Sequence, residues 1–109
     1  MPWDIVWRPA AEQDLTTCAA HIAADNIEAA LRFIDEVEVT VNSLADSPLL
    51  GTEMSFAHPD LAGLRRRVVS QRFRNYLLFY RAITPTRTVE LIRILHGARE
   101  LPPVLLNED

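Results

Sequence analysis

The sequence predicts an α+β domain in which an N-terminal helical hairpin packs on one face of a small, mainly antiparallel sheet. Two stretches with the apolar period of a helix occupy residues 10–46, and three strand-like runs with short connections follow residue 63. One short strand precedes the helices, so the predicted order is β-α-α-β-β-β. A chain of 109 residues fits a single domain over 1–109, with a short tail from about residue 100.

The N-terminal part begins with a strand and a helix. Residues 3–7 are rich in aromatic and β-branched side chains, with Trp3, Ile5 and Trp7 on one side, which predicts a strand. Pro9 suits the first turn of a helix, because its missing N–H costs nothing there. The apolar residues that follow the helical period to about residue 24 are Ala11, Leu15, Cys18, Ala19 and Ile22.

A second helix is predicted after Asp25-Asn26, which supplies a break and a cap, and the run Asp46-Ser47-Pro48 stops it. Its apolar stripe consists of Ile27, Ala30, Ile34, Val37, Val41 and Leu44. The acidic residues that lie largely off this stripe, and that we expect in solvent, are Glu28, Asp35, Glu36 and Glu38. Because only a few residues separate the two helices, they should form an antiparallel hairpin.

The C-terminal half is predicted to form the sheet. Residues 49–63 have no sustained period and contain two glycines and a proline, which predicts a loop. The strands predicted after it are residues 64–70, 74–82 and 88–96, and their short connections require antiparallel pairing. Both faces of these strands are largely apolar, but the hairpin covers only one. We therefore expect the second face to be an open apolar strip, which is typical of a partner site.

Charge is divided unevenly along the chain. All 11 basic residues are arginine, and nine of them lie in residues 61–99 beside a single acid, Glu90. Residues 1–60 carry only Arg8 and Arg32 against 11 acids. The sequence therefore predicts an acidic helical half and a basic strand half, and the basic half is where a polyanion or an acidic partner peptide would bind.

Alternation along the strands distributes the arginines over both faces of the sheet. Arg66 points to one side of its strand, and Arg65 and Arg67 point to the other. Strict alternation in the last strand groups Val89, Leu91, Arg93 and Leu95 on one side, and Glu90, Ile92, Ile94 and His96 on the other. Because a guanidinium can bind carboxylates bidentately and stack on aromatic rings, this arrangement favours a protein interface.

The residues predicted to bind a partner are Arg65, Arg67, Arg74, Tyr76, Tyr80, Arg81, Arg93, His96 and Arg99. For any single arginine of this set, an ion pair with a helix carboxylate of the same chain is an equally good interpretation. For the set as a whole, we favour an interface.

Several short motifs follow one another along nearly the whole chain. The helical region carries Ala11-x-x-Asp14-Leu15, His21-Ile22-Ala23-x-Asp25-Asn26 and Ala29-Ala30-x-Arg32-Phe33. The central region carries Leu44-Ala45-x-x-Pro48-x-x-Gly51 and Leu61-x-Gly63-Leu64-Arg65-x-x-Val68. The last two strands carry Arg74-Asn75-Tyr76-Leu77-x-Phe79-Tyr80-Arg81 and Val89-x-x-Ile92-Arg93-Ile94-Leu95-His96-Gly97-Ala98-Arg99. Together these motifs resemble ParE toxins of the ParE/RelE toxin superfamily.

This resemblance implies the toxin of a bacterial type II toxin–antitoxin pair. Such a toxin is neutralised by the C-terminal segment of a cognate antitoxin, with which it forms a hetero-oligomer. The ParE branch is associated with inhibition of DNA gyrase, and the RelE branch with cleavage of messenger RNA in the ribosomal A site. Fold alone does not separate these activities. A third interpretation is a member that binds its antitoxin and is not toxic.

A metal-free ribonuclease needs a base for the 2′-hydroxyl, a cation for the phosphate and an acid for the leaving oxygen. The candidate catalytic residues for this alternative are His96, Arg81 and Arg93, although His96 also fits a purely structural strand end. The resemblance implies that this catalytic set is incomplete, because ribosome-dependent relatives usually carry a tyrosine near the end of the last strand. This chain has no tyrosine after Tyr80. We therefore predict a gyrase inhibitor without a catalytic site.

No cofactor or metal site is predicted, because Cys18 is the single cysteine and the three histidines lack the spacing of metal ligands. No signal-peptide pattern or membrane-length apolar run is present, so we expect a cytoplasmic protein. The excess of 15 acids over 11 arginines argues against sequence-specific DNA binding by this chain. Within the implied pair, operator binding fits the antitoxin better.

Overall fold

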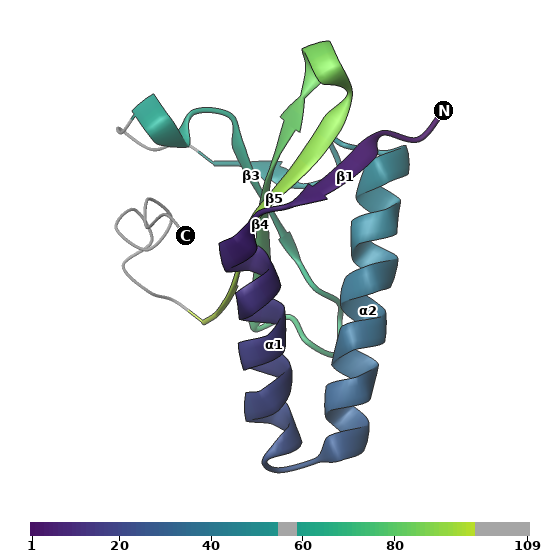
Figure 1. Cartoon of the computed structure of the whole chain (residues 1–109), viewed down its shortest axis with the longest axis vertical. Helices are drawn as coiled ribbons and strands as arrows, with labels where there is room; N and C mark the ends of the chain where they lie inside the picture. Colours follow the sequence, from purple (N-terminus) through teal and green to yellow (C-terminus); the bar gives the residue numbers. More distant parts are fainter. Residues whose placement is uncertain (55–58, 98–109) are drawn as a thin grey trace.

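The computed structural model describes residues 1–54 and 59–97. Strand β1 (Asp4–Trp7) leads into helices α1 (Pro9–Ala23) and α2 (Ile27–Asp46), which lie side by side as a hairpin (Figure 1). The remaining strands are β2 (Thr52–Glu53), β3 (Leu64–Val68), β4 (Tyr76–Ile83) and β5 (Thr88–His96). Short 3₁₀ turns form at Pro59–Leu61 and Thr84–Thr86. The loop of the helical hairpin and the β4–β5 turn lie at opposite ends of the molecule (Figure 1).

The strands form one mixed sheet in the order β1-β5-β4-β3-β2. β1 pairs with β5 in parallel, and all other neighbouring strands pair antiparallel. The antiparallel pairs follow from short connections, whereas β1 meets β5 only after the chain has passed through both helices. The predicted fold class is confirmed. The structure adds strand β2, which lies within the predicted loop of residues 49–63.

Local sequence signals account for the element ends. Pro9 occupies the first turn of α1, and the side chain of Asn26 caps α2 by accepting the N–H of Ala29 at 3.0 Å. Strand β4 begins at Tyr76, so Arg74 lies in the turn after β3 and not in a strand as predicted.

The main core lies between the helical hairpin and the sheet. Helix α2 contributes Phe33, Val37 and Leu44, all of which are fully or almost fully buried. Ile27 and Ile34, predicted in the buried stripe of this helix, are exposed instead. The buried face of α2 is centred on Phe33, Val37 and Leu44, and it is rotated away from these two isoleucines.

The second face of the sheet carries a smaller core. Leu64, Phe79, Ile92 and Leu95 are at most 4% exposed, and Leu61 of the 3₁₀ turn packs against them. The prediction of an open apolar strip is therefore wrong over the centre of this face. The sequence could not reveal this, because the segment that supplies Leu61 has no periodic pattern of its own.

Strand β5 contains a bulge. Leu91 and Arg93 oppose successive residues of β4, which leaves Ile92 as the extra residue. As a result, Leu91 lies in the core under the helices, whereas Leu95 lies in the core on the other face. The strict alternation that placed Leu91, Arg93 and Leu95 on one side is wrong beyond Leu91.

Candidate functional site

Two of the predicted partner-binding arginines are held by the fold. Arg65 donates to the carbonyl oxygen of Gly51 at 2.8 Å. Arg81 donates to two carbonyl oxygens of the segment 59–62, and its guanidinium lies 3.9 Å from a carboxylate oxygen of Glu90. These contacts tie the loop between α2 and β3 to the sheet. Both arginines therefore have a structural role within the chain.

Arg93 joins strand β5 to helix α1. Its Nε and Nη2 atoms donate to the two carboxylate oxygens of Asp14 at 2.6 and 2.9 Å. The backbone N–H of Ile94 donates to the same carboxylate at 2.9 Å. Both side chains of the pair are mostly buried, and a bidentate pair of this kind is strong and well oriented. For Arg93, the interpretation as an internal partner of a helix carboxylate is therefore the correct one.

Tyr80 is a structural residue under the helices. Its hydroxyl donates to the carbonyl oxygen of Pro48 and accepts the N–H of Gly51, each at 2.8 Å. Burial raises the pKa of the phenol, and the hydrogen bond from Gly51 and the charges of Arg65 and Arg67 partly oppose this effect. The side chain is 0% exposed, so it offers no surface to a partner.

In the strand half, the arginines left for a partner are Arg66, Arg67 and Arg74, which we call the free arginines. Within residues 1–54 and 59–97, none of them makes a side-chain hydrogen bond or an ion pair. Arg66 and Arg67 belong to β3, and Arg74 lies in the adjoining β3–β4 turn. Arg66 is not among the predicted partner-binding residues, although its position on β3 makes it exposed. Arg99 of the predicted set lies outside the described residues.

His96 lies beside Tyr76 at the end of the sheet. The two residues are partners across the β4–β5 ladder, and their ring centroids are 4.6 Å apart. Together with Cys18 and His21 of α1, they line a pocket of about 240 Å³. Tyr76 is 8% exposed, and its hydroxyl has no hydrogen-bond partner among the described residues. Burial raises the pKa of this phenol, and the neighbouring Cys18 has a smaller effect in the same direction.

This pocket contains acid–base groups that sequence reasoning did not group together. Tyr76 and His96 are 20 positions apart, and His21 comes from the helical half of the chain. Only the cross-strand register of β4 and β5 reveals the first pair. The pocket therefore holds a tyrosine beside His96.

The three candidate ribonuclease residues are not gathered in one site. Arg81 is opposite Glu90, six residues before His96, which corresponds to roughly 20 Å along a strand. Arg93 is nearer to His96, but its guanidinium is bound by Asp14. Of the three candidate ribonuclease residues, neither arginine is therefore available beside His96.

Among the described residues, no three histidine, cysteine or carboxylate side chains lie close enough together to hold a metal ion. In the same part of the chain, no helix combines the length and the apolar character that crossing a membrane requires. His58 lies outside the described residues.

Known proteins resemble this chain in both sequence and structure. The family model described as the ParE toxin of the type II toxin–antitoxin system parDE matches residues 5–101. The chromosomal ParDE toxin–antitoxin system from P. aeruginosa gives a TM-score of 0.68 at 18% identity, over 88% of this chain and 97% of the other. The toxin–antitoxin complex RelBE2 from Mycobacterium tuberculosis gives 0.57 at 24% identity, over 88% and 99%. No curated protein matches the chain. The solved structures share the fold, and the family match shows that this chain belongs to the ParE toxin family of type II toxin–antitoxin systems.

Proposed function

We propose that this chain is a toxin that stops bacterial growth by binding DNA gyrase without chemistry of its own, and that a cognate antitoxin neutralises it. Membership of the ParE family supports the toxin role. The observation that favours a binding mechanism is the separation of Arg81 from His96 and the engagement of Arg93 by Asp14. A phosphodiester-cleaving site would need a cation beside its general base.

The direct test is a supercoiling assay with purified gyrase and the full chain. Supercoiling should be blocked at near-equimolar toxin and restored when the antitoxin is added. Relaxation of the same plasmid by a topoisomerase other than gyrase serves as the control and should be unaffected. Complete supercoiling at a severalfold excess of toxin would overturn the gyrase assignment.

We further propose that an acidic, partly apolar segment of the antitoxin contacts the free arginines. Arg65 and Arg81, which the sequence predicted at this contact, are left out because their side chains donate to backbone carbonyl oxygens of the same chain. Arg66 is added to the contact. Substituting Arg66, Arg67 and Arg74 together by glutamate should weaken the complex by at least about tenfold, and more strongly at low salt. Arg32→Glu is a matched control on the exposed side of α2. Equal affinity of the triple variant and the control would contradict this contact.

A second candidate function, ribosome-dependent RNA cleavage, is favoured by one observation. Tyr76 and His96 lie in contact, and both line a pocket that also contains His21. An imidazole and a phenol can serve as base and acid for attack by a 2′-hydroxyl. Expression of the toxin should then produce cleavage of messenger RNA at A-site codons that disappears in His96→Ala and falls in Tyr76→Phe. Intact messages after induction, with growth arrested, would remove this candidate.

A further inference from the structure

The pocket beside Tyr76 and His96 gathers polar groups from three elements. Helix α1 contributes Asp14, Thr17 and His21, whose spacing of three and four residues places them on one face of the helix. Tyr76 is the first residue of β4 and His96 is the last residue of β5, so both lie at the same end of the sheet. We call this space, whose volume is about 240 Å³, the α1–β5 pocket.

The hydroxyl of Tyr76 directs an unused donor into the α1–β5 pocket. The side chain is 8% exposed and makes no hydrogen bond within the described residues. Over the same residues, no buried side-chain nitrogen or oxygen lacks both a partner and contact with solvent. The hydroxyl therefore reaches the open space of the pocket and not the apolar core, where an unpaired hydroxyl is costly. Because burial raises the pKa of this phenol, it keeps its proton at neutral pH and can donate it.

The carboxylate of the α1–β5 pocket already has its donors. Asp14 accepts two N–H groups of Arg93, at 2.6 and 2.9 Å, and the backbone N–H of Ile94 at 2.9 Å. The charge of Arg93 also balances the charge of Asp14. The other lining groups that can donate belong to Thr17, Cys18, His21, Tyr76 and His96. The pocket therefore favours a ligand that is rich in acceptor oxygens.

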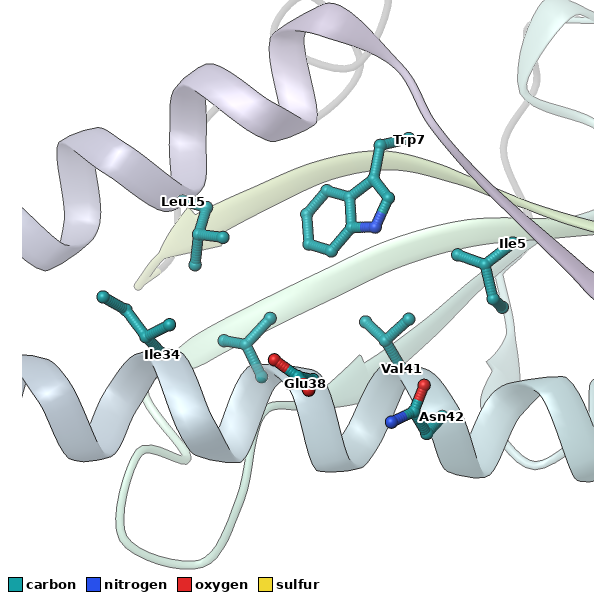
Figure 2. Close-up of a pocket in the computed structure, with 8 residues that line it drawn as sticks. Ile5, Trp7, Leu15, Ile34, Glu38, Val41 and Asn42 are labelled. Carbon is teal, nitrogen blue, oxygen red and sulfur yellow. The ribbon is translucent and has the colours of Figure 1, made fainter.

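A second hollow in the molecule has a different character. It lies between β1 and the two helices with a volume of about 310 Å³, and Trp7 and Leu15 point across it toward α2 (Figure 2). Its lining is mainly apolar, and the charged group in it is the carboxylate of Glu38. An oxyanion in this hollow would meet a like charge and few donors. Of these two spaces, the α1–β5 pocket is therefore the one suited to an anion.

The donors of the α1–β5 pocket match a phosphate group. A phosphate monoester carries a charge of about −1.5 to −2 at neutral pH, and its three terminal oxygens are strong acceptors. An imidazole can take up a proton near neutral pH and then donates from both ring nitrogens. Ile94 and Leu95 add an apolar part to the lining. The ring of His96 is exposed beside Tyr76, so it can stack on an aromatic ring of a ligand.

We propose that the α1–β5 pocket binds a small phosphate monoester with an aromatic body. The phosphate oxygens accept from Tyr76, Thr17 and His21, and the aromatic body lies against Leu95 and His96. This inference goes beyond the proposed function, because it requires neither gyrase nor the antitoxin. It also involves no bond cleavage, so it is independent of the ribonuclease candidate.

The test follows the binding of phenyl phosphate to the full chain by NMR, through the imidazole proton resonances of His21 and His96. Both resonances should shift along one saturable curve, and phenol, which lacks the phosphate, should bind at least about tenfold more weakly. Tyr76→Phe should raise Kd by about tenfold, because it removes a hydrogen bond to a charged group. Thr17→Val should raise Kd by about fivefold. Thr16→Val is the matched control, because Thr16 is also exposed on α1 but does not line the pocket, and it should change Kd by less than about twofold.

Three outcomes would overturn this inference. The first is the absence of a saturable shift up to about 10 mM phenyl phosphate. The second is an equal Kd for the wild type, Tyr76→Phe and Thr17→Val, which would place the ligand elsewhere on the surface. The third is equal binding of phenol and phenyl phosphate, which would show that the pocket recognises the ring and not the phosphate. The assay contains neither gyrase nor antitoxin, so each of these outcomes leaves the proposed function unchanged.

Discussion

Replacement of Tyr80 by phenylalanine tests whether this residue organises the chain internally. The hydroxyl bridges the N–H of Gly51 and the carbonyl oxygen of Pro48, each at 2.8 Å, and the side chain is completely buried. The substitution keeps the ring and removes only the bridging oxygen. Gly51 is itself buried, so its N–H loses its partner without access to water. We therefore expect a loss of stability and no effect on partner binding.

The expected size of this effect follows from the two lost hydrogen bonds. An unsatisfied buried donor costs about 1–3 kcal/mol, whereas the half-buried Pro48 carbonyl can bind water at a smaller cost. We expect a decrease of about 2 kcal/mol in the free energy of unfolding. For a domain of this size, that corresponds to a decrease in Tm of roughly 8–16 °C.

The assay is urea denaturation of the purified full chain, followed by circular dichroism. The midpoint should decrease while the m-value stays unchanged. Tyr76→Phe is the matched control, because it removes a hydroxyl from the same strand without losing a described hydrogen bond, and its effect should stay within about 0.5 kcal/mol. If both variants lost the same stability, or if Tyr80→Phe matched the wild type, the proposed anchoring of the loop would be refuted. Weaker antitoxin binding by folded Tyr80→Phe would also contradict it.

Three further predictions concern stability. A Cβ atom added at Gly51 would lie 2.7 Å from the Tyr80 ring and 2.9 Å from a backbone oxygen of β3, so Gly51→Ala should cost about 1–3 kcal/mol in thermal denaturation, and an unchanged Tm would contradict the tight packing. Asp14→Asn removes the carboxylate charge that pairs with the mostly buried Arg93 and should cost about 3 kcal/mol in urea denaturation, part of which Arg93→Gln in the same chain should recover; additive losses would argue against the pair. Burial raises the pKa of Tyr76 and Tyr80, so above about pH 10 the unfolded chain loses phenolic protons before the folded one does. The free energy of unfolding should therefore fall as the pH rises above about 10, and it should fall less steeply in Tyr80→Phe. A free energy of unfolding that stays constant up to about pH 12, roughly two pH units above the ordinary pKa of a phenol, would contradict this.

The sequence by itself determined the order of the elements except for the short strand β2, and most of their ends. The apolar periods of α1 and α2, the cap at Asn26 and the strand run ending at His96 are local signals, and local signals decide secondary structure. It also determined the division of charge between the two halves. The motifs that resemble ParE toxins follow from the same residues, and the family match over 5–101 agrees with them.

The tertiary structure alone decided which neighbours cover each surface. A period shows which side of a helix is apolar, but not how far another element covers it. Ile34 of α2 lines a pocket together with Leu15 of α1 and is still 37% exposed, and Ile27 is 68% exposed. Likewise, Leu61 comes from a segment without any period and packs into the core on the second face of the sheet.

The roles of the site residues depend on contacts between distant parts of the chain. Arg93 has a structural role because its side chain pairs with Asp14, 79 positions away in the sequence. Tyr76 lies beside His96 only because of the register between β4 and β5. The β5 bulge reverses the alternation that the strand sequence predicts. Such pairings are set by packing of the whole chain and not by local pattern. The sequence therefore determined that the strand half is basic, and only the tertiary structure decided which of its arginines are free to meet a partner.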